Sequence, residues 1–176
     1  HSHESHLHHL CELADKAELN KVYIHAFTDG RDTDPKSGKS FIENLEAKTK
    51  NLSAELVSVI GRYYAMDRDK RWERIKLAYD LLVNAKGAKS TCITNAIQTS
   101  YENGISDEFI KPISKTDQNG NPIAKINEGD LVICFNFRTD RCREISQVLT
   151  QEDKPELNMY KLNLNYITMT MYDQSF

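Results

Sequence analysis

Hydrophobic and polar positions along this chain follow two different periods, which predict alternating strands and helices. Short apolar runs rich in β-branched residues predict strands over 22–27, 56–60, 131–137 and 165–171. Apolar positions three or four residues apart predict helices over 9–19, 41–52, 69–84, 91–101 and 138–150. Such an alternation is typical of the α/β class. We therefore expect a layered helix–sheet–helix domain with a mixed, mainly parallel sheet.

One segment departs from this alternation. The apolar runs 109–114 and 122–126 flank Asn119-Gly120, a pair that favours the tight turn of a β-hairpin. The sequence therefore predicts a β-hairpin insertion in the α/β fold. No linker or internal repeat divides the chain, so we expect residues 1–176 to form one domain.

Composition narrows the class of protein. The chain has 176 residues, of which 39% are hydrophobic and 28% are charged, enough for one domain with a core. It has no run of 18 apolar residues, so no membrane-spanning segment is expected. A net charge of −3 argues against nucleic acid or an anionic membrane as a partner. The four cysteines, none in a C-x-x-C pair, are expected to be free thiols in a reducing compartment: Cys11, Cys92, Cys134 and Cys142.

Arginines carry the clearest chemical signal. All eight lie in three short segments, each starting where a predicted strand ends: Arg31; Arg62, Arg68, Arg71 and Arg74; and Arg138, Arg141 and Arg143. Ligands of open α/β sheets bind at the carboxyl ends of strands, and a guanidinium binds phosphate or carboxylate through two parallel hydrogen bonds. Arg138 and Arg141 would share one face at the start of a predicted helix. The alternative is a set of scattered surface salt bridges.

Two further groups of residues could take part in chemistry. Asp32, next to Arg31, could exchange a proton with a substrate hydroxyl, or it could only hydrogen-bond nearby backbone in an Asx turn. The histidines at the start of the chain could bind a metal, could be solvated at a helix N-terminus, or could be residual tag: His1, His3, His6, His8 and His9. No other His or carboxylate completes a metal motif. His25 lies within a predicted strand, where it would be packed in the core or support a neighbouring site residue.

Four motifs occur in a fixed order along the chain: His1-Ser2-His3 with His8-His9-Leu10, Asp29-Gly30-Arg31-Asp32, the GRYYAMDRDKRW block at 61–72, and Phe135-Asn136-Phe137-Arg138-Thr139-Asp140-Arg141. Together they closely resemble the cofactor-independent (2,3-bisphosphoglycerate-independent) phosphoglycerate mutases, over nearly the whole chain. Enzymes of that family interconvert 3-phosphoglycerate and 2-phosphoglycerate, in glycolysis and gluconeogenesis, in the cytoplasm and without added 2,3-bisphosphoglycerate.

The resemblance implies a two-domain isomerase of which this chain is one part. One domain, related to alkaline phosphatase, binds two manganese ions and carries a serine nucleophile. The other is inserted into it, binds the substrate and is called the phosphotransferase domain. This chain resembles only the inserted domain. We therefore expect a fragment of a protein about three times as long, with no metal site in this chain and no mutase activity in isolation.

By motif position, the substrate-binding residues implied by the resemblance are His1, Arg31, Asp32, Arg62, Arg68, Arg138 and Arg141. The arginines would hold the carboxylate and the phosphate while the glycerate is reoriented between two phosphoryl transfers through a phosphoserine. Asp32 would be the catalytic residue that handles the hydroxyl proton, and His1 would contact the transferring group. Two other functions remain open from the residues alone: a stand-alone module that binds phosphorylated metabolites without catalysis, and an RNA-binding α/β domain, which the net charge disfavours.

Overall fold

A computed structural model describes residues 2–176 of the chain. Its main sheet has four strands in the order β1-β2-β4-β3: β1 (Val22–Thr28), β2 (Ala54–Gly61), β3 (Ala88–Ser90) and β4 (Ile113–Lys115). β1 and β2 are parallel, β2 and β4 are antiparallel, and β4 and β3 are parallel. A second sheet pairs β5 (Leu131–Cys134) with β6 (Asn165–Thr168) in parallel. The predicted α/β class with a mixed, mainly parallel sheet is confirmed.

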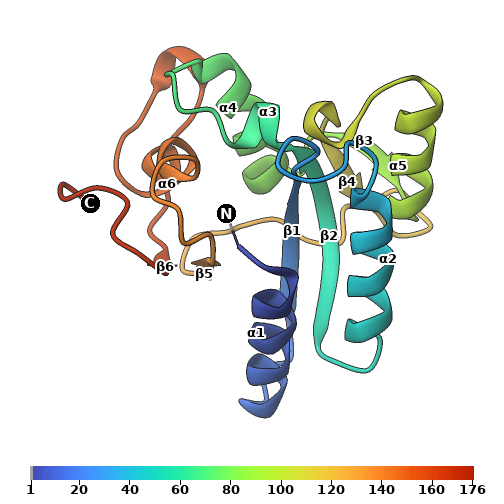
Figure 1. The fold of residues 1–176 in the computed structure, drawn as a ribbon. Coiled ribbons are helices and arrows are strands. Elements are labelled where there is room, and N and C mark those ends of the chain that lie inside the picture. The colour runs from blue at the N-terminus through green and yellow to red at the C-terminus, as the bar shows by residue number, and fades with distance from the viewer. Residues whose placement is uncertain (1) are drawn as a thin grey trace.

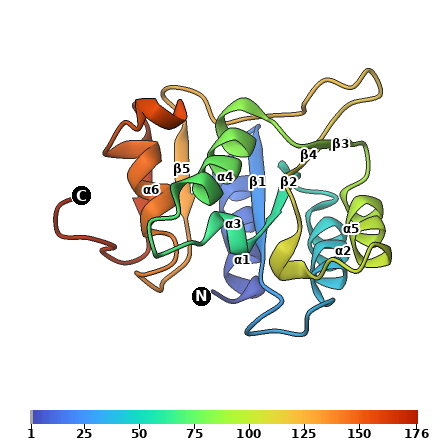
Figure 2. The ribbon, with the colours of Figure 1, turned by 90° about the horizontal axis from the view of Figure 1, so that it is seen from above.

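Helices cover both faces of the main sheet. Their bounds are α1 (Glu4–Lys16), α2 (Gly38–Thr49), α3 (Arg62–Ala65), α4 (Trp72–Asn84), α5 (Ile93–Glu102) and α6 (Arg143–Thr150), with 3-10 turns η1 (Asp107–Phe109) and η2 (Pro155–Leu157). β1 and β2 form the long central pair, with α2 and α5 on one side and α6, β5 and β6 on the other (Figure 1). The view from above shows the same order, with α3 and α4 in front of the central strands (Figure 2). Within residues 2–176, every helix is too short or too polar to cross a membrane.

Burial on two sides explains the continuous apolar run of β2. Every residue of this strand except Glu55 is buried. Val59 packs with residues of α1, α2 and α5, whereas the next residue, Ile60, packs with residues of α4 and α6. Neighbouring side chains of a strand point to opposite faces, so each face of β2 meets its own layer of helices.

The predicted hairpin is reduced to a turn. Gly120 has φ +80°, and the carboxylate of Asp117 accepts the backbone N–H groups of Asn119 and Asn121. Only one bridge, between Thr116 and Pro122, closes this turn. The strand on its N-terminal side, β4, pairs instead with β2 and β3, and a proline offers no N–H to extend a ladder on the other side.

The predicted helix over 138–150 is wrong in its first third. α6 begins at Arg143 with Cys142 as its N-cap, so Arg138 and Arg141 lie in the turn before the helix and not on its face. The first helix also differs from the prediction of 9–19, since it runs from Glu4 to Lys16. It starts early because the His3 side chain accepts the backbone N–H of Ser5, which caps the helix. The strand β3 and the short helix α3 were not predicted.

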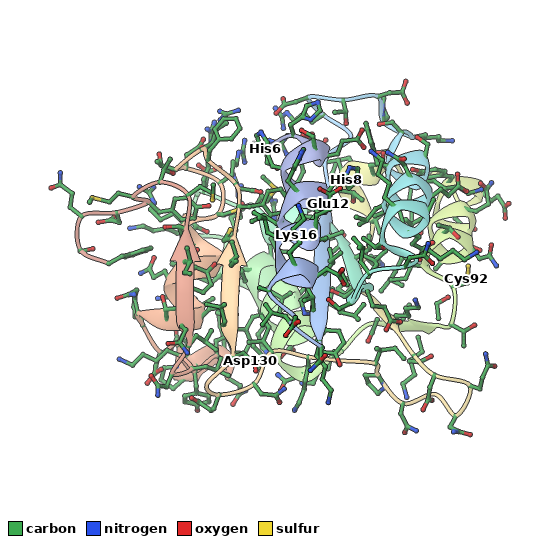
Figure 3. The ribbon with its side chains drawn as sticks, turned by 90° about the horizontal axis from the view of Figure 1, so that it is seen from below. His6, His8, Glu12, Lys16, Cys92 and Asp130 are labelled. Carbon is green, nitrogen blue, oxygen red and sulfur yellow. The ribbon has the colours of Figure 1, made fainter. Side chains whose placement is uncertain are left out.

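All four cysteines are free thiols, as the sequence predicts. Cys11 and Cys142 are buried, and Cys92 and Cys134 are partly exposed. Cys92 lies beside α5, on the opposite side of the molecule from β5 and β6 (Figure 3).

Candidate functional site

The loop after β1 is built around Asp29. Its carboxylate accepts the backbone N–H of Arg31 at 3.0 Å and of Asp32 at 2.9 Å. The Asx turn considered for Asp32 is therefore centred on Asp29. The Asp32 carboxylate instead accepts a hydrogen bond from Arg62 Nη1 at 3.0 Å, and the same nitrogen donates to Asp29 at 2.7 Å. One arginine thus holds both carboxylates of the loop.

Arg62 is the buried member of this group. It is the first residue of α3, directly after β2, and its side chain is 4% exposed. Burial alone would lower the pKa of Arg62, but its hydrogen bonds to Asp29 and Asp32 raise it above the ordinary value. Burial would likewise raise the pKa of Asp29, yet the hydrogen bonds it accepts from the Asp32 N–H, Arg62 and the Arg31 N–H lower it. Both groups are therefore charged at neutral pH.

Asp107 is a buried residue that packs against this loop. It is 1% exposed, and its carboxylate accepts the backbone N–H of Gly38 at 2.7 Å and the hydroxyl of Tyr101. Its carbonyl oxygen accepts the hydroxyl of Thr28, at the end of β1, at 2.8 Å. Burial raises the pKa of the Asp107 carboxyl. Asp107 thereby connects the N-terminus of α2, α5 and the start of the loop that carries Arg31 and Asp32.

Three glycines allow Asp107 and Glu108 to approach so closely. A Cβ on Gly30 would lie 2.7 Å from Asp107, one on Gly38 would lie 2.5 Å from it, and one on Gly61 would lie 2.3 Å from the Glu108 carbonyl oxygen. Gly30 also has φ +66°, which L side chains rarely adopt. Glu108 in turn pairs with Arg31, with 3.5 Å between Nη1 and Oε1. Each of these glycines comes from a different part of the chain.

Arg68 and Arg138 meet at one carboxylate. Arg68 Nη1 lies 2.8 Å from Asp140 Oδ2, and Arg138 Nε lies 3.7 Å from Asp140 Oδ1. Their side chains are 47% and 49% exposed. Asp140 thus links the segment after α3 to the loop before α6, and both guanidinium groups keep access to solvent.

Arg141 is held against the same segment from the other side. Its Nη1 donates to the carbonyl oxygen of Met66, directly after α3, at 3.1 Å. Its Nε is buried and has no hydrogen-bond partner within the described part of the chain. A buried donor without an acceptor costs free energy unless a ligand or water supplies one. The Arg141 guanidinium is therefore suited to receive an anion.

Electrostatic effects show that the three arginine segments converge. Burial lowers the pKa of Arg141, and the charges of Arg68, Arg62 and Arg31 lower it further against the opposing effect of Asp140. Such an effect on Arg141 requires the other guanidinium groups to lie nearby. The arginines of the three segments thus lie near one another around α3. Ion pairs with carboxylates, the alternative considered for them, are also present at Arg31, Arg62, Arg68 and Arg138.

Histidines do not form a metal centre in the described residues. His1 lies outside them. His3 caps α1, His6 and His8 lie further along that helix, and His8 is within hydrogen-bond distance of Lys48 on α2, at 3.1 Å (Figure 3). Within residues 2–176, no three His, Cys, Asp or Glu side chains come together to hold a metal ion. His25 hydrogen-bonds Ser58 across the sheet, and burial lowers its pKa to about 4, so it is a neutral packed residue.

Sequence reasoning missed the carboxylates that hold the arginines. Asp29 and Asp140 lie inside the motifs named above. Because they are close to Arg31 and Arg141 along the chain, the sequence could have indicated that carboxylates lie among these arginines. Glu108 is 77 residues from Arg31, and no local pattern marks it. Arg74, outside the predicted site, stacks on Tyr63 of α3, with 3.8 Å between Arg74 Cζ and the ring centroid.

Known proteins share this architecture. The family model described as BPG-independent PGAM N-terminus (iPGM_N) matches residues 1–174. The 2,3-bisphosphoglycerate-independent phosphoglycerate mutase of Flavobacterium psychrophilum is 61% identical over 176 residues, which is 100% of this chain and 35% of that protein. The enzyme of the same name from Clostridium perfringens is 46% identical over 99% of this chain and 34% of its own length.

Solved structures agree with the sequence relatives. The fold matches a crystal structure of Leishmania mexicana phosphoglycerate mutase at low cobalt concentration with a TM-score of 0.91 and 28% identity, over 99% of this chain and 34% of that one. The chain spans about a third of the length of the curated relatives it matches. With its fold, its gathered arginines and a match over residues 1–174, the chain belongs to the BPG-independent PGAM N-terminus family.

Proposed function

We propose that this chain is the substrate-binding part of a 2,3-bisphosphoglycerate-independent phosphoglycerate mutase that interconverts 3-phosphoglycerate and 2-phosphoglycerate. The names of the relatives support the reaction. The observation that carries the binding role is the gathering of arginines from three chain segments around α3, with Arg141 Nε buried and without a partner. Phosphate and carboxylate are the anions that match guanidinium groups in this number and arrangement.

The arginines have two different roles toward a substrate with two anionic groups. Arg68, Arg138 and Arg141 are the groups that bind its phosphate or carboxylate, since two of them are exposed and the third has an unused donor. Arg31 and the buried Arg62 hold the loop that carries Asp32, and they set the local positive potential. Positioning and neutralisation of charge are the main requirements of phosphoryl transfer.

Asp32 is the catalytic residue in this proposal. Arg62 Nη1 donates to its carboxylate at 3.0 Å, which fixes the position of the group that accepts the proton. When the glycerate 2-hydroxyl attacks the phosphoryl group, its proton passes to Asp32. In the reverse direction Asp32 returns that proton to the leaving oxygen. His1 contacts the transferring group.

The remaining chemistry belongs to the rest of the polypeptide. We assign the serine nucleophile and the two manganese ions to a phosphatase-like domain outside this chain. The phosphoryl group passes from the 3-oxygen of the substrate to that serine and returns to the 2-oxygen of the retained glycerate. This chain provides the surface on which the glycerate is held and reoriented. We place the protein in the cytoplasm, in line with its four free thiols, and assign it no nucleic acid or membrane partner.

Calorimetric titration of the full-length protein with 3-phosphoglycerate tests the proposal, together with an assay of its conversion to 2-phosphoglycerate. We expect turnover, and we expect both affinity and turnover to fall when Arg141 is replaced by Ala. Binding without turnover in the manganese-loaded protein would favour an anion-binding module. No binding of 3-phosphoglycerate would overturn both.

A further inference from the structure

Two cysteines stand at the two ends of the loop that carries Arg138 and Arg141. Cys134 is the last residue of β5, and Cys142 is the N-cap of α6. Residues 135–141 between them are here named the arginine loop. Both sulfurs belong to one cluster with Asn136 and Tyr172, which holds the two ends of this loop together. The proposed function gives this pair no role.

Polar groups surround the pair and fix its position. The Asn136 amide donates to Cys142 Sγ at 2.9 Å, and the Tyr172 hydroxyl is 3.3 Å from Cys134 Sγ. The Tyr172 hydroxyl also donates to the Asn136 carbonyl oxygen at 2.5 Å. The thiolate is the reactive form of cysteine. The neighbouring Cys134 and burial raise the pKa of Cys142, which favours its thiol form. The hydrogen bond from Cys142 is the largest cause that lowers the pKa of Cys134 below its ordinary value.

The two thiols differ in access. Cys134 is partly exposed, whereas Cys142 is 0% exposed. An oxidant from solvent therefore reaches Cys134 first, and Cys142 is placed to react second. An accessible thiolate beside a second, resolving thiol is the usual arrangement of a redox-sensing pair.

We propose that Cys134 and Cys142 form a reversible disulfide when the protein meets a peroxide, and that this bond controls the arginine loop. The Cys134 thiolate attacks one peroxide oxygen, the O–O bond breaks, and the leaving oxygen departs as water after it takes a proton. Cys142 then attacks the sulfur of the resulting sulfenic acid. An S–S bond forms, the S–O bond breaks, and a second water leaves. Two thiols are oxidised by two electrons, and one hydrogen peroxide is reduced to two waters.

The disulfide would change the site because it is shorter than the contact it replaces. An S–S bond measures about 2.05 Å, well below any hydrogen-bonded separation of two sulfurs. Arg141 directly precedes Cys142, and its hydrogen bond to Met66 fixes it against the segment after α3. Drawing Cys142 toward β5 strains that position and removes the sulfur acceptor of Asn136. Oxidation is therefore expected to weaken anion binding, a consequence that rests on the proposed function.

The test uses the full-length protein treated with hydrogen peroxide and then with dithiothreitol. Peptide mapping without reduction is expected to show a Cys134–Cys142 linked peptide. We expect kcat/KM for 3-phosphoglycerate to fall on the order of 10²-fold, the usual cost of a misplaced binding group, and to recover on reduction. The linked peptide is read by mass, so the chemistry is tested even if the proposed substrate is wrong.

Three variants decide the assignment. Cys134→Ser and Cys142→Ala should each abolish the reversible loss of kcat/KM. Cys134 is partly exposed, so its substitution disturbs the fold less than that of the buried Cys142. Cys92→Ser, a partly exposed thiol far from the arginine loop, should keep it. Absence of the linked peptide under conditions that oxidise Cys92 would overturn the pairing. A linked peptide with unchanged kcat/KM would overturn the control of the loop.

Discussion

The two sides of the arginine cluster both contain ion pairs, but they differ in whether a buried donor is left unused. On the side of the β1 loop, Arg62 bonds both Asp29 and Asp32, and Arg31 pairs with Glu108. On the side of the arginine loop, the buried Nε of Arg141 has no partner in the described residues. In the proposed function, the first side is therefore complete before a ligand arrives, and the second is completed by the ligand.

This difference separates two tasks that the same residue type performs. In the proposed function, arginines that hold the proton-transfer group Asp32 must not move when the substrate binds, and ion pairs with carboxylates of the protein fix them. Arginines that bind the substrate must keep donors for it, at a cost in stability. The following predictions test this division, beginning with the largest effect.

The isolated chain of residues 1–176 should show no conversion of 3-phosphoglycerate to 2-phosphoglycerate, even with manganese present. In the proposal, both sides of the cluster only bind and position the substrate, and the nucleophile lies elsewhere in the polypeptide. The full-length protein, assayed at the same concentration, is the control. Turnover by the purified chain would mean that a nucleophile is present within it.

Asp32→Asn in the full-length protein should lower kcat on the order of 10²-fold or more, because the side chain keeps its size but loses the proton-accepting carboxylate. KM should change far less, since the arginines of the second side remain. Asp34→Asn, in the same loop but outside the contacts of Arg62, is the matched control. A kcat within a few-fold of the parent would assign Asp32 a purely structural role.

Arg141→Lys should lower kcat/KM about 10- to 100-fold, the range expected when a charged hydrogen bond of about 1.5–3 kcal/mol is lost. Lysine keeps the charge, but its single nitrogen cannot occupy both the Nη1 position that bonds Met66 and the separate Nε position. Arg143→Lys, two residues along in α6, should be close to neutral. An unchanged kcat/KM in both variants would show that the loop acts only through its net charge.

Tyr101→Phe should lower the free energy of unfolding by about 1–2 kcal/mol, because the hydroxyl bonds both Asp107 and the backbone N–H of Lys39. Urea denaturation measures this change. Tyr23→Phe, on an exposed position of β1, is the control. If Asp107 holds the loop of Asp32 in position, kcat should also fall in the Tyr101 variant. An unchanged kcat would show that the contacts of Asp107 do not affect that loop.

Asp29 should give the smallest effect, and this effect should fade in acid. Its lowered pKa means that it stabilises the fold fully above the ordinary value of 3.8 and loses this contribution as the pH falls below it. Asp29→Asn should therefore cost up to about 1 kcal/mol at neutral pH, by the scale of partly exposed ion pairs, and less at pH 3. Equal losses at both pH values would show that the charge of Asp29 contributes nothing.

Local pattern was enough to predict the central strands and several helices. β1 and β2 are apolar runs buried on two sides, and the apolar spacing through Ile75, Ala78, Tyr79 and Leu82 predicts the buried face of α4. The arginine-rich turn at 138–142 was misread as helix, because its spacing fits a helical face while Cys142, not Arg138, caps α6. Asp107 and Glu108 could not be predicted, since their partners lie far away in the sequence.

The three glycines packed against Asp107 and Glu108 limit how this protein can be recombined with its relatives. Gly30, Gly38 and Gly61 each leave no room for a Cβ beside that two-residue segment. A chimera that takes residues 103–112 from one parent and residues 28–62 from another joins surfaces that have to fit at three separate places. The two segments therefore have to come from the same parent. A crossover between them is expected to preserve the fold only when both parents share these glycines and this backbone path.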